Sequence, residues 1–137
     1  MADTKDGPEL HPTTEELASG PNFAAMSTLL PSGRVQTQYV WVGVDGGRLY
    51  VNTEVHRQKF LDLERDARVT IAIRDEQNPY RYAEVRGTAG DVERGQAARD
   101  RIDELSQKYE GRPYPPEQIK TERVTVFVVP ERQTVAD

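Results

Sequence analysis

The segment "VQTQYVWVGVDGGRLYVN", residues 35–52, holds two runs of β-branched and aromatic residues on either side of a turn. Side chains of an extended first run alternate between two faces. One face would carry Gln36, Gln38, Val40 and Val42, and the other Val35, Thr37, Tyr39 and Trp41. Asp45 and Gly46 can adopt the positive φ angles of a tight primed turn. The segment therefore predicts an antiparallel β-hairpin.

The sequence on both sides of this hairpin predicts further strands and helices. Four segments have the apolar, β-branched composition of strands: residues 23–30, 67–74, 80–93 and 122–130. Helical patterns occupy residues 13–19, 54–66 and 97–111. Gly87 interrupts one strand and predicts a bulge or bend. We expect six strands, joined mostly by short connections, and two to three helices.

This order of elements predicts a mainly β protein with a six-stranded antiparallel sheet. Such a sheet in a short chain tends to curl into a barrel, because closure removes its edges. Residues 1–12 are charged, contain two prolines and offer little to bury, so we expect a disordered leader. Residues 13–137 form one domain in this prediction.

Composition excludes several classes of function. The 18 basic and 23 acidic residues give a net charge of −5, which argues against nucleic-acid binding. The chain has no Cys and only two His, so we expect no metal site and no Ser-His-Asp triad. No apolar run has the length of a membrane span, and we find no signal peptide. We expect a soluble, cytoplasmic protein.

The sequence carries no obvious catalytic machinery of its own. Glu76, Glu84 and Asp91 are scattered, and no phosphate-binding loop or nucleophile motif occurs. We single out no catalytic residue. If the protein is an enzyme, a bound cofactor supplies the chemistry.

One basic pair stands at a predicted strand-to-helix junction, "TEVHRQK" at residues 53–59. Thr53 is placed to cap the helix, and Arg57 and Lys59 follow two residues apart. A helix N-terminus attracts anions, and Arg and Lys both bind phosphate. The pair is either part of a solvated helix face, which the spacing alone favours, or a phosphate socket.

The ordered set of segments resembles the flavin and deazaflavin oxidoreductase superfamily, whose split β-barrel is related to pyridoxamine 5′-phosphate oxidase. The run "STLLPSGRVQTQYVWVGVDGGRLYVNTEVHRQKFLDLERDARVTIAIRD", residues 27–75, carries the resemblance, which extends over residues 20–130. It is closest to the deazaflavin-dependent branch. Members of that branch carry a Thr, a spaced Arg and Lys, a Leu and an acidic-Arg-Val segment, here Thr53, Arg57, Lys59, Leu63 and "RDARV".

The resemblance implies a split β-barrel of the flavin-reductase or FMN-binding type that forms a homodimer with cofactor sites at the interface. It places the cofactor ring against residues 38–41, with Gln38, Tyr39 and Trp41, and near Tyr50 and Val51. It places the phosphate at Arg57 and Lys59, beside Thr53. Tyr80 or Tyr82 would come from the facing subunit. Ordinary packing remains the alternative role for Tyr39, Trp41 and Tyr82.

The resemblance also implies the cofactor. We expect coenzyme F-420, an 8-hydroxy-5-deazaflavin, with FMN as the alternative, because both carry a phosphate on a ribityl chain. The acidic tail of F-420 would favour further cations, for which Arg112, Lys120 and Arg123 are candidates. The chain has no Trp after Trp41, whereas pyridoxamine phosphate oxidases hold substrate with a C-terminal Trp and Arg segment. We therefore do not expect vitamin B6 oxidation.

Three functions follow from these expectations. The first is a reductase that passes hydride from reduced F-420 to an unsaturated or conjugated small molecule. The second is a non-catalytic carrier of F-420, FMN or haem. The third is a β-barrel interaction module without a small-molecule ligand.

Overall fold

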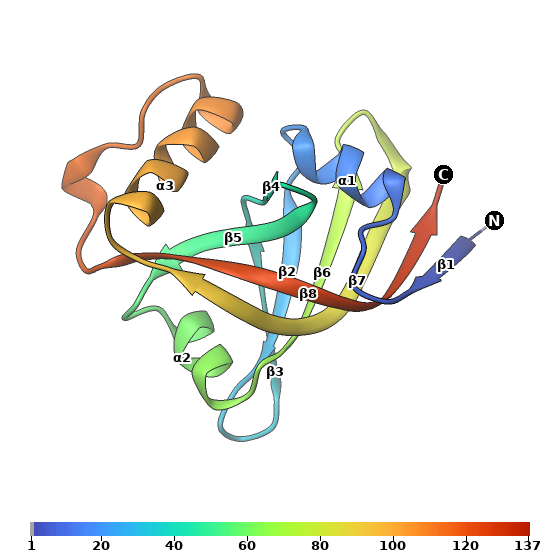
Figure 1. The fold of residues 1–137 in the computed structure, drawn as a ribbon, viewed down its shortest axis with the longest axis horizontal. Coiled ribbons are helices and arrows are strands. Elements are labelled where there is room, and N and C mark those ends of the chain that lie inside the picture. The colour runs from blue at the N-terminus through green and yellow to red at the C-terminus, as the bar shows by residue number, and fades with distance from the viewer. Residues whose placement is uncertain (1) are drawn as a thin grey trace.

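Two residues, Trp41 and Val42, interrupt the strand that the sequence predicts over residues 35–43. In the computed structural model, which describes residues 2–137, this stretch forms β3 (Val35–Val40) and β4 (Gly43–Asp45). The two strands lie at opposite ends of one sheet, whose order is β3-β2-β6-β7-β8-β5-β4. Since only two residues join the ends of that sheet, the sheet has to curl back on itself, as Figure 1 shows.

The sheet is antiparallel throughout and has eight strands among the described residues, with β1 paired to β8. The remaining strands are β1 (Ala2–Asp6), β2 (Ala24–Leu29), β5 (Arg48–Glu54), β6 (Arg68–Asp75), β7 (Asn78–Glu93) and β8 (Arg123–Ala136). The predicted mainly β, antiparallel sheet is confirmed, but the expected six strands and the closure into a barrel are not. The sheet gains β1 and β4, and it stays open because β3 and β4 do not pair with each other.

The segment expected to be a disordered leader contains β1. Its backbone pairs with the last part of β8, from Ala2 opposite Ala136 to Asp6 opposite Arg132. This part of β8 lies beyond its pairing with β5 and offers an open edge. Backbone hydrogen bonds along an edge need no apolar side chains, so the polar composition did not indicate a strand. Met1 lies outside the described residues.

Three α-helices flank the sheet: α1 (Pro12–Ser19), α2 (Gln58–Arg65) and α3 (Gly95–Glu110), with a short 3₁₀ turn, η1 (Pro116–Gln118). In Figure 1, α2 and α3 lie at the end of the sheet away from the chain termini, and α1 lies at the other end. The helix predicted over residues 97–111 is confirmed as α3, in which Ala98, Ile102 and Leu105 are buried on one face and Tyr109 is half-buried.

Two local predictions are settled by backbone geometry. Gly46 and Gly47 both have positive φ, at 57° and 76°, so the primed turn lies one residue later than predicted. The bulge at Gly87 is confirmed by a register shift between β7 and β8. A side chain there would overlap the carbonyl oxygen of Val129, which explains the glycine.

The hydrophobic core fills the inside of the curled sheet, and a smaller cluster lies under α3. That second cluster consists of Tyr50, Ile102, Leu105 and Phe127, with Trp41, Tyr109 and Tyr114 packed against it. It fixes α3 over β5 and β8. The α3 helix therefore stands beside the break between β3 and β4.

Candidate functional site

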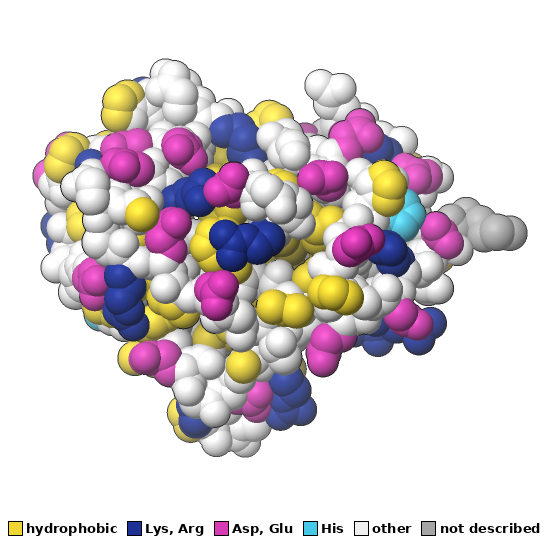
Figure 2. All heavy atoms as spheres, in the orientation of Figure 1, with side chains coloured by type: hydrophobic (Ala, Val, Ile, Leu, Met, Phe, Trp, Pro, Cys, Tyr) yellow, Lys and Arg dark blue, Asp and Glu magenta, His cyan; other side chains and the backbone are white. Residues whose placement is uncertain are grey.

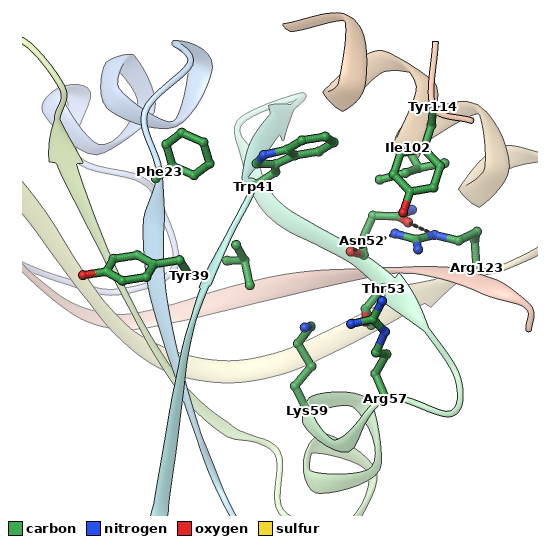
Figure 3. A pocket seen from close by; sticks show the side chains of 11 residues that line it. Phe23, Tyr39, Trp41, Asn52, Thr53, Arg57, Lys59, Ile102, Tyr114 and Arg123 are labelled. Atoms are coloured by element: carbon green, nitrogen blue, oxygen red, sulfur yellow. Dashed lines mark hydrogen bonds between the residues drawn. The ribbon is translucent and has the colours of Figure 1, made fainter. Parts of the chain in front are cut away.

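A cleft of about 270 Å³ opens where β3 leaves the sheet and faces β5. Its lining comes from parts of the chain that are far apart in sequence: Phe23, Tyr39, Val40, Trp41, Asn52, Thr53, Arg57, Lys59, Ile102, Tyr114 and Arg123. Figure 3 shows Phe23, Tyr39 and Trp41 on one side of this space and Arg57 and Lys59 on the other, with Tyr114 next to Arg123. The cleft thus combines a surface for a flat ring with a surface for an anion.

The basic side begins at α2. Arg57 is the N-cap residue of that helix and makes no side-chain cap, while Lys59 donates from Nζ to Gln38 Oε1 at 3.2 Å. Among residues 2–137, neither cation has a carboxylate within ion-pair distance. Burial, followed by the charges of Arg57 and Arg123, lowers the pKa of Lys59. A bound anion would relieve that repulsion.

Arg123 adds a third cation from β8. Its guanidinium donates from Nε to Asn52 Oδ1 at 2.8 Å and from Nη1 to Glu54 Oε2 at 3.4 Å. Burial lowers the pKa of Arg123. On the face of the molecule in Figure 2, basic and acidic side chains are interspersed. In the cleft, Arg57, Lys59 and Arg123 line one space.

Glu54 accepts a hydrogen bond from Arg123 and is fully buried. One carboxylate oxygen accepts the backbone N–H groups of Lys120 and Thr121, both at 2.6 Å. Burial acts to raise the pKa of Glu54, but these two hydrogen bonds and the Arg123 charge outweigh it and hold the pKa below its usual value. The carboxylate therefore stays ionised and paired.

The aromatic side is built around Trp41. Its indole stacks on Tyr109, with ring centroids 5.2 Å apart and planes inclined by 5°, and meets the edge of Tyr114 at 6.4 Å. The Tyr109 hydroxyl donates to Asn22 O at 2.7 Å and accepts from Val42 N at 3.1 Å. Burial raises the pKa of Tyr109 to about 12. These contacts hold the Trp41 ring in place from behind.

The structure brings together half of the residues that the sequence proposed for the site. Tyr39, Trp41, Thr53, Arg57 and Lys59 line the cleft, and Gln38 touches it through Lys59. Thr53 is a buried residue of β5, opposite Val124, and not the cap of α2. The prediction that Thr53 caps α2 is therefore wrong, although Thr53 does line the cleft.

Four of the proposed residues lie elsewhere. Tyr50 and Val51 are buried in the packing behind the cleft. Tyr80 is 85% exposed on β7, and Tyr82 lines a neighbouring hollow. Whether a second subunit brings either tyrosine to a cofactor stays a prediction.

Sequence reasoning missed four residues that line the cleft, Phe23, Asn52, Ile102 and Tyr114, and included Val40 only within the range 38–41. Arg123 was one of three candidate cations without an assigned place. Asn52 and Arg123 meet because β5 and β8 pair in a register that sets Glu54 opposite Arg123. No local pattern marks such a pairing across about 70 residues, so only a strand-pairing prediction could have found it.

A larger hollow of about 610 Å³ adjoins the cleft and shares Phe23 and Tyr39 with it. Its other lining residues are Ala25, Ala72, Ile73, Arg74, Glu76, Pro79 and Tyr82. Arg74 and Glu76 lie 3.8 Å apart and compensate each other. The hollow is therefore mainly apolar and without net charge.

Among residues 2–137, no three side chains of His, Asp or Glu come together as a metal-binding group. None of the helices in this described part of the chain is both long enough and apolar enough to cross a bilayer.

The curled antiparallel sheet, open at the β3–β4 break and carrying a cleft with aromatic and cationic sides, defines a split-barrel protein of the kind that binds flavin-type cofactors. The family pattern described as pyridoxamine 5′-phosphate oxidase matches residues 10–135. The chain belongs to this family.

Solved structures agree with this assignment. A structure named as an F-420 reductase has a TM-score of 0.78 and 28% sequence identity, with 90% of this chain and 98% of that chain covered. A conserved hypothetical protein from Mycobacterium tuberculosis has a TM-score of 0.74 and 23% identity, covering 96% and 87% of the two chains. The haem storage protein HutZ from Vibrio cholerae has a TM-score of 0.66 and 16% identity, covering 93% and 95%. The last two show the fold alone. No curated protein sequence matches the chain.

Proposed function

We propose that this protein is a reductase that binds reduced coenzyme F-420 in the cleft and reduces an unsaturated or conjugated small molecule. The family and the fold support a flavin- or deazaflavin-type oxidoreductase or binding protein. The similarity to a structure named as an F-420 reductase favours the deazaflavin over FMN. The observation that carries the proposal is the cleft itself, which joins uncompensated cations to a stacked aromatic side.

The residues of the cleft match the chemistry of this cofactor. F-420 carries a planar tricyclic ring and a phosphate on a ribityl chain. Arg57 and Lys59 would hold the phosphate, because neither has a carboxylate partner among the described residues and both line the same space. Tyr39 and Trp41 would hold the ring, because their side chains offer flat apolar surface.

When bound and reduced, the deazaflavin supplies a hydride from its ring C5. The contribution of this chain is to bind and orient, since proximity of donor and acceptor accounts for much of the rate enhancement in such a reaction. The adjoining hollow would take the acceptor. Its apolar lining suits a conjugated molecule, and Phe23 and Tyr39 border both spaces.

We also propose that the protein acts as a homodimer. Tyr39 is 82% and Tyr80 85% exposed, which is unusual for large aromatic side chains. A second copy packed over these residues would cover them and close the hollow beside the cleft. Sedimentation velocity of the purified protein tests this point, and a monomer at micromolar concentration would contradict it.

The experiment for the function has two stages. The protein is first titrated with F-420 and with FMN, by absorbance and fluorescence. Reduced F-420 is then supplied with a panel of quinones, enones and tetrapyrroles, and its consumption is followed. Turnover of at least one acceptor is the expected result. Tight binding without consumption across the panel would indicate a carrier, and failure to bind either cofactor would contradict the proposal entirely.

A further inference from the structure

Arg123 reaches the cleft from a different wall than Arg57 and Lys59. The latter two belong to the start of α2, whereas Arg123 is the first residue of β8. Figure 3 shows Arg57 and Lys59 extending from α2 on one side and Arg123 entering beside Tyr114. The Arg123 guanidinium carbon lies 5.3 Å from the centre of the Tyr114 ring. The three cations therefore do not form one cluster on one element.

The position of Arg123 is fixed by its own contacts. Nε and Nη2 donate to the side-chain and backbone oxygens of Asn52, at 2.8 and 3.3 Å, and Nη1 donates to Glu54 at 3.4 Å. A guanidinium has five N–H groups. Three of them have partners among residues 2–137, so two remain for a ligand.

Asn52 and Glu54 are in turn anchored. Asn52 Nδ2 donates to Ala98 O at 2.9 Å and to Thr125 Oγ1 at 3.0 Å. Glu54 is buried and accepts two backbone hydrogen bonds. Because Asn52 and Glu54 are themselves fixed, the Arg123 guanidinium that they bind is preorganised. It therefore loses little conformational entropy when a ligand binds.

We propose that Arg123 is a second anion-binding position of the cleft, which recognises an acidic group in the cofactor tail beyond the phosphate. Asn52 and Glu54 act as its positioning residues. This inference rests on the proposed function and makes it more specific. The two other cations considered for the tail are engaged elsewhere, because Arg112 pairs with Glu110 and the Lys120 ammonium donates to Glu117 O.

The charge balance separates the roles of the cations. Glu54 compensates Arg123, so Arg123 acts mainly through directed hydrogen bonds. Arg57 and Lys59 lack such compensation and already provide two positive charges for one phosphate. A ligand with a phosphate alone should therefore depend on Arg57 and Lys59 and not on Arg123. A ligand with additional carboxylates should depend on all three.

The test compares two ligands with the same ring. One is F-420 with its lactyl-glutamate tail, and the other is the ribityl 5′-phosphate of the same deazaflavin, without the tail. Dissociation constants are measured by fluorescence titration for the wild type, Arg123→Met and the control Arg112→Met. We expect Arg123→Met to weaken F-420 binding by about 10- to 100-fold, as for loss of one charge-assisted contact. Binding of the tail-less phosphate should change by less than about 3-fold, since only screened charge is lost.

Equal weakening of both ligands would overturn the inference, because Arg123 would then belong to the phosphate socket. No weakening of either would overturn it as well. If the wild type binds neither ligand, the proposed function falls together with the inference. Arg123→Met leaves Glu54 buried without its partner, so Glu54→Gln/Arg123→Met, which removes both charges, is measured in parallel. The same selective loss for F-420 is expected in the double variant if it folds like the wild type by circular dichroism.

Discussion

Replacing Arg57 and Lys59 by alanine should abolish most of the affinity for F-420 while leaving the fold intact. The two side chains line one cleft and have no carboxylate partner among residues 2–137. Their charges are therefore free for a ligand. The substitution of Lys59 removes a single side-chain hydrogen bond, the one that Lys59 donates to Gln38.

The expected magnitude follows from the exposure of the two groups. A hydrogen bond to a charged group contributes about 1.5–3 kcal/mol. Arg57 is exposed and Lys59 half-buried, so we take the lower end of that range for each. The double variant should lose about 3 kcal/mol of binding free energy, which corresponds to roughly a 100-fold increase in Kd.

The assay is a fluorescence titration with F-420 at low ionic strength, paired with urea unfolding. Arg34→Ala/Arg112→Ala is the matched control, because it removes two exposed cations outside the cleft and changes the net charge equally. The free energy of unfolding should stay within about 0.5 kcal/mol of the wild type in both variants, as for surface substitutions. Unchanged affinity in Arg57→Ala/Lys59→Ala, or an equal loss in the control, would mean that the pair does not bind the phosphate.

Three other predictions concern single residues. Glu54→Gln should lower the free energy of unfolding by about 3 kcal/mol in urea, because it breaks a buried pair with Arg123; a loss below 1 kcal/mol would contradict it. Cofactor binding should quench the emission of Trp41, the only Trp, and binding detected by ultrafiltration without quenching would place the ligand elsewhere. Burial lowers the pKa of Lys108 to about 8, below its unfolded value, so the unfolded state binds more protons above pH 8. Stability should therefore rise by about 1 kcal/mol between pH 8 and 10, and Lys108→Met should remove the rise.

Local patterns predicted the parts of the fold that local physics controls. Alternating side chains indicated the strands, and Gly87 indicated a bulge that the register shift confirms. Trp41 and Val42 could not be recognised as a break, because "VWV" continues the β pattern without interruption. The break depends on where the sheet ends, which is a property of the whole chain.

The part of the site that lies within one short stretch of sequence could be predicted. Arg57 and Lys59 stand within one junction and were identified there. Arg123 joins them through the β5–β8 pairing, whereas Tyr50 packs with the residues under α3 and does not line the cleft. Strand pairing over long sequence distances brings the rest of the cleft together, and a single sequence gives no direct signal for it.

A crystal structure of the protein with F-420 would show directly whether Arg57 and Lys59 hold the phosphate. We expect the cofactor in the cleft between β3 and β5, with its phosphate hydrogen-bonded to both Arg57 and Lys59 and its ring beside Trp41. A cofactor bound at another surface, with those two side chains extending into solvent, would contradict it.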